Sequence, residues 1–122
     1  MREEYSLKKA GNWQRDFNSL VLEVIDESLM GIGGDTARII YYYLEKKYVK
    51  KRDIPSKIEK FSACLSMIFG GEAGQFIETL IMKAFNKRID GRIAVNGYTL
   101  KEYIEKVRGI FSRRMSAATR NL

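Results

Sequence analysis

Two apolar segments joined by a glycine pair, within residues 61–85, constrain the fold of this chain more strongly than any other feature. In the first segment the apolar residues recur at spacings of three and four, the period of one helix face: Phe61, Leu65, Ile68 and Phe69. Beyond Gly70 and Gly71 the pattern resumes at Phe76, Ile77, Leu80, Ile81, Ala84 and Phe85. Because Gly70 can take the left-handed conformation that closes a helix, we predict two adjacent core helices. Four side chains are expected to be buried together: Phe61, Leu65, Phe76 and Leu80.

The sequence before this pair predicts two further helices. Residues 13–30 carry one apolar face, which comprises Phe17, Leu20, Val21, Val24 and Ser28. Residues 35–48 follow a glycine-rich turn, and Asp35 or Thr36 is expected to cap this second helix. Its predicted inner face comprises Ala37, Ile40, Leu44 and Tyr48. Because successive helical residues point ~100° apart, the consecutive tyrosines 41–43 cannot all be buried.

Two hydroxyl residues stand three positions before a glutamate, which is the pattern of a capping box at a helix start. Ser56 with Glu59 is expected to open the first core helix, and Thr99 with Glu102 a last helix that reaches about residue 115. Turn signals at residues 90–91 and 96–97 predict a short extended segment or hairpin near residues 91–98. The sequence thus predicts an all-α, single-domain bundle of about five helices over residues 1–122, with a core at residues 13–89 and a C-terminal extension at residues 90–122.

The composition argues against several classes of protein. The chain has no histidine and one cysteine, Cys64, which removes histidine-based acid–base catalysis and most zinc or iron sites. Glu23, Asp26 and Glu27 fall within one helical turn, and without histidine partners we interpret them as a solvated acidic face. No apolar run approaches the ~20 residues of a membrane span, and the N-terminus lacks the apolar core of a signal peptide. We expect a cytoplasmic protein that is not an enzyme, holds no cofactor or metal and has no membrane contact.

Three groups of residues between positions 24 and 89 form a recognisable pattern. They are IIYYYLEK at residues 39–46; Ile54-Pro55, Ile58-Glu59, Phe61 and Ile68-Phe69-Gly70; and Ile77-Glu78 with Leu80-Ile81. This pattern resembles a family of small archaeal domains described as Nitrosopumilus output domain type, which occur alone or attached to signalling and sensor modules. The matched residues are mostly core and turn residues, so the resemblance implies a fold and an output-type role rather than a chemistry.

Positive charge is unevenly distributed along the chain, whose formal net charge is +7. Residues 83–122 carry ten basic and three acidic side chains, and residues 43–60 carry seven and three. Basic groups beside aromatic residues suit phosphate contacts and base stacking. The candidate nucleic-acid contacts lie in patches at residues 46–52 and 101–114: Lys46, Lys47, Lys50, Lys51, Arg52, Arg108, Arg113 and Arg114. In the alternative interpretation, the lysines at the end of the second helix only stabilise its dipole.

The last predicted helix carries a wide apolar stripe that has two ordinary fates. It can pack on the chain's own core, or it can bury itself against a second copy. Because the preceding helices already suffice for a bundle, we predict a homodimer with contacts at Leu100, Tyr103, Ile104, Val107 and Phe111.

Two hypotheses about function follow from the sequence. The first is a non-enzymatic protein-interaction or regulatory output-type domain in an archaeal cytoplasm, with an unidentified protein partner. The alternative is a nucleic-acid-binding protein that uses the two basic patches.

Overall fold

The structure, a computed structural model, describes the backbone of residues 13–120 and the side chains of residues 13–116. It confirms the predicted all-α bundle of about five helices. The helices are α2 (Trp13–Ile32), α3 (Gly34–Lys46), the 3₁₀ helix η1 (Lys51–Ser56), α4 (Ile58–Phe69), α5 (Gly71–Ile89) and α6 (Leu100–Arg120). None of these helices is both long enough and apolar enough to cross a membrane.

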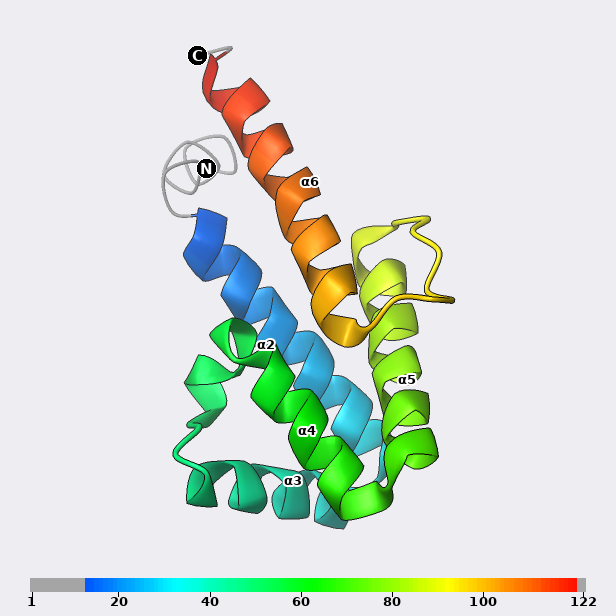
Figure 1. Cartoon of the computed structure of the whole chain (residues 1–122). Coiled ribbons are helices and arrows are strands. Elements are labelled where there is room, and N and C mark those ends of the chain that lie inside the picture. The colour runs from blue at the N-terminus through cyan, green and yellow to red at the C-terminus, as the bar shows by residue number, and fades with distance from the viewer. Residues whose placement is uncertain (1–12, 121–122) are drawn as a thin grey trace.

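The helices enclose one apolar core (Figure 1). The predicted pair, α4 and α5, makes the most extensive contact between elements, and α2 packs against α3, α5 and α6. Helix α3 closes one end of the bundle, while α6 extends beyond the other end (Figure 1). The basic residues at the end of α3 and those on the last turns of α6 therefore lie at opposite ends of the molecule.

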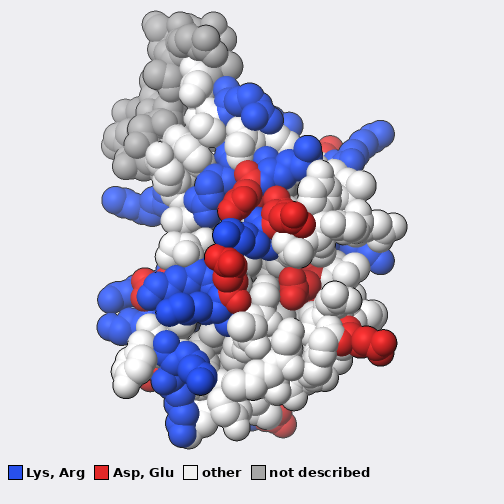
Figure 2. Space-filling model, in the orientation of Figure 1, with Lys and Arg blue, Asp and Glu red and all other residues white. Residues whose placement is uncertain are grey.

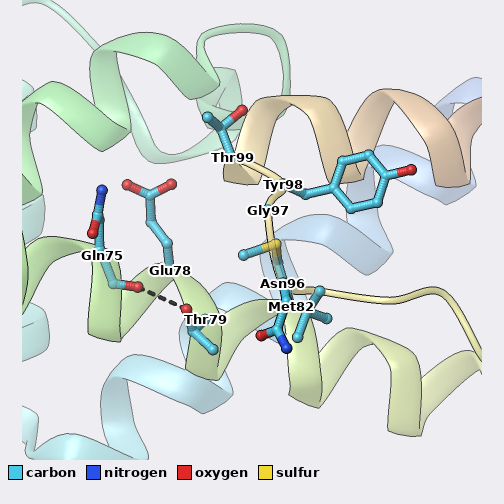
Figure 3. A pocket seen from close by; sticks show the side chains of 9 residues that line it. Gln75, Glu78, Thr79, Met82, Asn96, Gly97, Tyr98 and Thr99 are labelled. Atoms are coloured by element: carbon cyan, nitrogen blue, oxygen red, sulfur yellow. Dashed lines mark hydrogen bonds between the residues drawn. The ribbon is translucent and has the colours of Figure 1, made fainter.

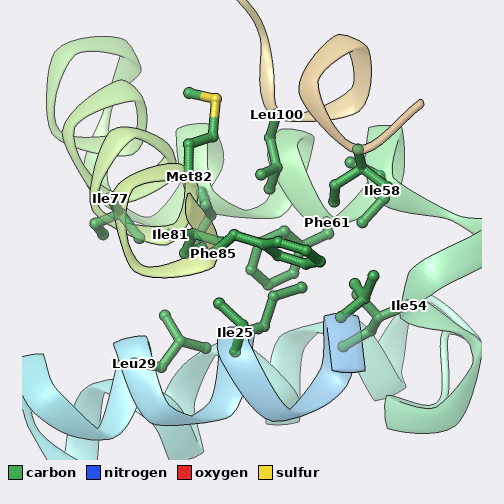
Figure 4. Close-up of a cluster of buried hydrophobic side chains, with 14 of the residues drawn as sticks. Ile25, Leu29, Ile54, Ile58, Phe61, Ile77, Ile81, Met82, Phe85 and Leu100 are labelled. Carbon is green, nitrogen blue, oxygen red and sulfur yellow. The ribbon is translucent and has the colours of Figure 1, made fainter. Parts of the chain in front are cut away.

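Aromatic rings form the centre of the core (Figure 4). Phe61 and Phe85 are buried among side chains from α2, α4, α5 and α6. The ring centroids of Phe17 and Phe85 lie 5.9 Å apart, and Phe85 meets Tyr103 edge-on at 5.9 Å. These tilted and edge-on geometries are the favoured ones for aromatic pairs, so the rings add to the stabilisation from burial.

The predicted inner face of α5 was rotated by about one residue. Phe76 is 65% exposed, and Leu80 is only half-buried, whereas the buried positions include Ile77, Ile81 and Phe85. Gly74 supplies the physical reason, because a Cβ there would lie 3.3 Å from the backbone nitrogen of Ser66 on α4. This close approach points the face with Gly74 toward α4 and leaves Phe76 in solvent.

Two of the three predicted caps were wrong. The N-cap of α3 is Gly33, without a side-chain cap, and Asp35 instead pairs with Arg38. The N-cap of α4 is Lys57, also without a side-chain cap, and the Ser56 hydroxyl instead donates to the Asp53 carbonyl within η1.

The third predicted cap, the capping box that opens α6, is confirmed. The backbone N–H of Thr99 donates to Glu102 Oε1 at 2.9 Å, and the N–H of Glu102 donates to Thr99 Oγ1 at 3.1 Å. Glu78 of α5 adds a further acceptor, for the N–H of Leu100 at 3.1 Å. This start of α6 is thus fixed both by its own sequence and by α5.

The connection from α5 to α6 is irregular and forms no strand within the described residues, so the hairpin form of the prediction does not occur. Asn86 holds the connection, because its Nδ2 donates to the Ile93 carbonyl at 2.6 Å. Its Oδ1 accepts from the buried Tyr103 hydroxyl. One amide side chain thereby ties the connection to both flanking helices.

The stripe on α6 packs on the chain's own core. Four of the five predicted dimer contacts are buried within the chain: Leu100, Tyr103, Ile104 and Val107. The fifth, Phe111, is half-buried. The ring of Phe111 packs against that of Phe17 in a tilted geometry, at a centroid distance of 5.1 Å. These side chains are therefore not available as a dimer surface in the folded chain, and residues 90–116 belong to the bundle rather than to an appendage.

Candidate nucleic-acid interface

The first basic patch is a compact, protruding turn. We call residues 46–52 the basic turn; it joins the end of α3 to η1, and its five cationic side chains are all exposed: Lys46, Lys47, Lys50, Lys51 and Arg52. Figure 2 shows basic side chains gathered at the left edge of the molecule, where Figure 1 places this connection. The structure therefore brings together all the candidate contacts of the first patch.

The backbone of the basic turn forms a Schellman motif, which ends α3. The N–H of Val49 donates to the Leu44 carbonyl at 2.9 Å, and the N–H of Tyr48 donates to the Glu45 carbonyl at 2.9 Å. Leu44 and Val49 are both buried, which is the apolar contact that accompanies this motif. Two buried side chains and two hydrogen bonds therefore fix the path of the turn.

Tyr48 occupies the left-handed position of this motif, where glycine is usual. Its φ is +63°, and its side chain is 90% exposed. The prediction that Tyr48 lies on the inner face of the second helix was wrong, because the helix ends at Lys46 and the chain reverses. A bulky residue in this conformation is a rare outlier, and this one gains almost no burial in return.

We expect Tyr48→Gly to raise the free energy of unfolding by about 1 kcal/mol, because glycine removes the steric cost of a Cβ in the left-handed region. Urea denaturation measures the change. Tyr48→Ala is the matched control: it deletes the same ring but keeps a Cβ, so its stability should stay close to that of the original chain. A Gly variant no more stable than the Ala variant would contradict this account of the turn.

Only some of the cations in the turn are used internally. Lys51 Nζ lies 3.0 Å from Asp26 Oδ1 and 4.6 Å from the centroid of the Tyr41 ring. Lys46 lies over the ring of Tyr42, at 4.9 Å. In contrast, no acidic side chain within the described part of the chain forms an ion pair with the other three cations: Lys47, Lys50 and Arg52.

The contact between Lys51, Asp26 and Tyr41 anchors the turn to α2. The Tyr41 hydroxyl donates to Asp26 Oδ1 at 2.8 Å. The hydrogen bonds from Lys51 and then from Tyr41 lower the pKa of Asp26, while burial followed by the bond to Asp26 raises the pKa of Tyr41. Both groups therefore keep their usual charge at neutral pH, and Lys51 has a structural role beside any binding role.

The second basic patch does not form a single surface. Arg108 is half-buried: it donates to Asn18 Oδ1 at 3.1 Å and to the Pro55 carbonyl at 3.4 Å, and it lies 4.8 Å from the centre of the Phe17 ring. Burial lowers its pKa. The prediction that Arg108 contacts nucleic acid is therefore corrected, since its guanidinium holds α6 against α2 and η1.

The other described cations of α6 do not form one surface. Lys106 lies over the Tyr98 ring, 6.0 Å from its centroid. Lys101 forms an ion pair with Glu59 at 2.9 Å. Arg113 and Arg114 are exposed on the distal turns of α6, far from the basic turn (Figure 1). They are thus separate from the patch at residues 46–52.

The acidic group on α2 is committed to other contacts. Arg88 bonds Glu23 and Glu27 across the surface, and Asp26 is held by Lys51 and Tyr41. Among residues 13–120 no cluster of three or more His, Cys, Asp or Glu side chains could hold a metal ion. The buried Cys64, whose pKa is raised by burial, packs beside the Ile40 carbonyl.

A pocket of about 430 Å³ lies between α5 and the connection to α6 (Figure 3). Two of its polar side chains make structural bonds: Glu78 accepts from the N–H of Leu100, and the Thr79 hydroxyl donates to the Gln75 carbonyl at 3.0 Å.

The end of the bundle closed by α3 carries a second kind of surface. Several large apolar side chains are exposed there, on α3 and at the adjoining ends of α2, α4 and α5: Met30, Ile32, Ile39, Tyr42, Tyr43, Met67 and Phe76. We call these seven residues the apolar end. Charged side chains lie among them, because Asp35, Arg38 and Glu45 line the same hollow as Ile39 and Tyr42.

No family model, curated protein or solved structure matches the chain.

Sequence reasoning found the cations of the basic turn but missed the position of Tyr48. A signal for it exists in the spacing of the apolar residues. Leu44 and Val49 are five apart, as the apolar pair of a Schellman motif requires, with a lysine pair on the last turn between them. Without a glycine at position 48, the motif is easily overlooked.

Proposed function

We propose that the chain acts by contact rather than by catalysis, and that it binds nucleic acid through the basic turn. The observation that carries this proposal is Tyr48, an exposed aromatic side chain kept at a strained backbone position between two groups of cations. Strain of this kind persists where the surrounding structure fixes it, and it clusters at functional sites.

Electrostatics support the same surface. Lys47, Lys50 and Arg52 are exposed and free of ion pairs with other described residues. Cations in this state can neutralise phosphates and release the counterions around a nucleic acid. The Lys51 pair with Asp26 is itself exposed, and such a pair stabilises the fold by only about 0–1 kcal/mol, so Lys51 can also approach a phosphate at little cost.

A salt titration of binding tests this proposal. The triple variant Lys47→Gln, Lys50→Gln and Arg52→Gln should weaken binding to random-sequence DNA and lower the log–log salt slope by up to about 2–3. The melting temperature should change little, because the three side chains are exposed. Fluorescence anisotropy of a labelled oligonucleotide, at several salt concentrations, gives both the affinity and the slope.

The matched control removes the same charge elsewhere. Lys83, Arg113 and Arg114 are exposed and lie outside the basic turn, so replacing all three by Gln gives a protein of identical net charge. If binding depends on the turn, this control keeps most of the affinity and slope. An equal loss in both triple variants would mean that net charge alone attracts DNA, and an original chain without affinity at physiological salt would refute the proposal.

A second candidate function is the protein-interaction or regulatory output role implied by the family resemblance. The apolar end favours it, because an exposed cluster of large apolar side chains commonly marks a contact surface. The same surface could join two copies in a homodimer, in place of the α6 stripe. Sedimentation of the full chain across micromolar concentrations, beside a Tyr42→Lys variant, measures this: a dimer weakened by the lysine supports the surface, and a monomer throughout excludes self-association.

A further inference from the structure

We propose that the basic turn is specific for single-stranded nucleic acid, and that the ring of Tyr48 is a platform on which one unpaired base stacks. This inference rests on the proposed nucleic-acid binding and adds the class of ligand and the residue that selects it.

The first argument is that the Tyr48 ring has no structural use. It is 90% exposed, so burial of its ring contributes almost nothing to the fold. Its backbone conformation costs stability that glycine would recover. A side chain that neither packs nor suits its backbone is best explained by what it offers to a ligand.

The second argument is that the backbone that carries this ring is held in place. Val49 and Leu44 are buried on either side of the reversal, and the two backbone hydrogen bonds of the motif fix the Cα of Tyr48. The aromatic group therefore projects from a rigid turn rather than from a loose loop. Such preorganisation reduces the ordering cost when a base stacks on the ring.

The third argument concerns the surrounding charge. Lys46 and Lys47 precede Tyr48 by two residues and one residue, and Lys50, Lys51 and Arg52 follow it by two to four residues. Cations therefore precede and follow Tyr48 along the chain, so phosphates on either side of a base stacked on this ring would meet positive charge. Alternation of cationic and aromatic contacts is the usual way of binding single strands without sequence preference.

The fourth argument selects single strands over a duplex. The faces of bases inside a duplex are covered by their neighbours, so a protruding tyrosine can stack only on an unpaired base or on one it unstacks at a cost of a few kcal/mol. Duplex sequence is usually read by a helix or ribbon lying in the major groove. The basic turn presents a tight chain reversal instead, with cations before and after Tyr48 in the sequence.

The test compares single-stranded and duplex DNA across a set of Tyr48 variants. The probes are a labelled oligothymidylate of about 12 nucleotides, within the usual site size, and the duplex that it forms with its complement. Tyr48→Gly and Tyr48→Ala should lower affinity for the single strand by roughly 5- to 100-fold. Both should leave the weaker affinity for the duplex nearly unchanged, and Tyr48→Trp should retain or increase single-strand affinity.

The Gly and Ala variants separate binding from folding. Both lack the ring, but only the Gly variant is expected to gain stability, so a loss of binding shared by the two cannot come from unfolding. Equal single-strand affinity in the Gly, Ala and original chains would overturn the stacking role. If the variant with Lys47, Lys50 and Arg52 replaced by Gln still loses affinity in that case, the proposed nucleic-acid binding stands, but without a stacking role for Tyr48.

Two further probes cover other anionic partners. Polyglutamate and vesicles containing phosphatidylserine offer negative charge without bases. The proposal predicts that both probes bind weakly, and that this binding does not depend on the Tyr48 ring. Binding as tight as that of the oligothymidylate, with the same loss in the Gly and Ala variants, would assign the turn to acidic peptides or membrane surfaces and overturn the inference.

Discussion

Replacing Phe61 by alanine is expected to lower the free energy of unfolding by about 3–5 kcal/mol, the usual cost of removing a buried phenyl ring. Phe61 is 0% exposed and lies in the aromatic centre of the core, among side chains from several helices. The cavity left behind cannot close without moving those helices, so the cost should fall near the upper end of this range. Urea denaturation monitored by circular dichroism provides the measurement.

Phe76→Ala is the matched control for this prediction. The same ring is removed, but Phe76 is 65% exposed on the outer side of α5, so the loss should stay below about 0.5 kcal/mol. Comparable losses in the two variants would contradict the rotation of α5 that the structure shows.

Replacing Asn86 by alanine is expected to cost about 2–3 kcal/mol. The substitution removes the acceptor of the buried Tyr103 hydroxyl and the donor to the Ile93 carbonyl at the same time. A buried polar group without a partner costs about 1–3 kcal/mol. The loss should appear in the same denaturation experiment, with a sharp rise in amide exchange in residues 91–95 once the connection is released.

Tyr103→Phe separates the two halves of this network. It removes the hydroxyl but preserves both the ring and the bond from Asn86 to Ile93, so we expect a loss of about 1 kcal/mol. Amide exchange in the connection should then stay as in the original chain. If the Phe variant released the connection as fully as the Ala variant, the hydroxyl rather than the amide would be its anchor.

The sequence was sufficient to predict the five α-helices because the apolar spacing recurs in each of them, but it did not predict the 3₁₀ helix η1, which carries no such pattern. It did not fix which of two neighbouring apolar residues faces inward on α5. Phe76 and Leu80 lie four residues apart, as do Ile77 and Ile81, and periodicity alone allows either of these two pairs to be buried. The close approach at Gly74 decides between them, and that contact depends on the position of α4.

The candidate site was predictable only in its composition. A run of cations at residues 46–52 is visible in the sequence, but the roles of individual cations depend on distant partners. Arg108 meets Asn18, ninety positions away, and becomes a structural group. Tyr48 leaves the helix because α3 ends at Lys46, two residues earlier than its apolar pattern suggests.

The apolar stripe of α6 shows the same limit. Its width correctly indicated extensive burial, but the sequence could not decide between packing within the chain and packing against a second copy. Contacts of α6 with α2, α4 and α5, which include the tilted pair of Phe17 and Phe111, show that the stripe packs within the chain.

The most direct test of the central claim is a titration of the isotope-labelled chain with the oligothymidylate, followed through backbone amide shifts. The account predicts that the largest shifts fall on residues 46–52, with Tyr48 and Val49 among them. It predicts little change at residues 109–114 on the distal half of α6, although Arg113 and Arg114 are also exposed and positively charged. Shifts centred on α6, or shifts absent at saturating oligonucleotide, would contradict the assignment of nucleic-acid binding to the basic turn.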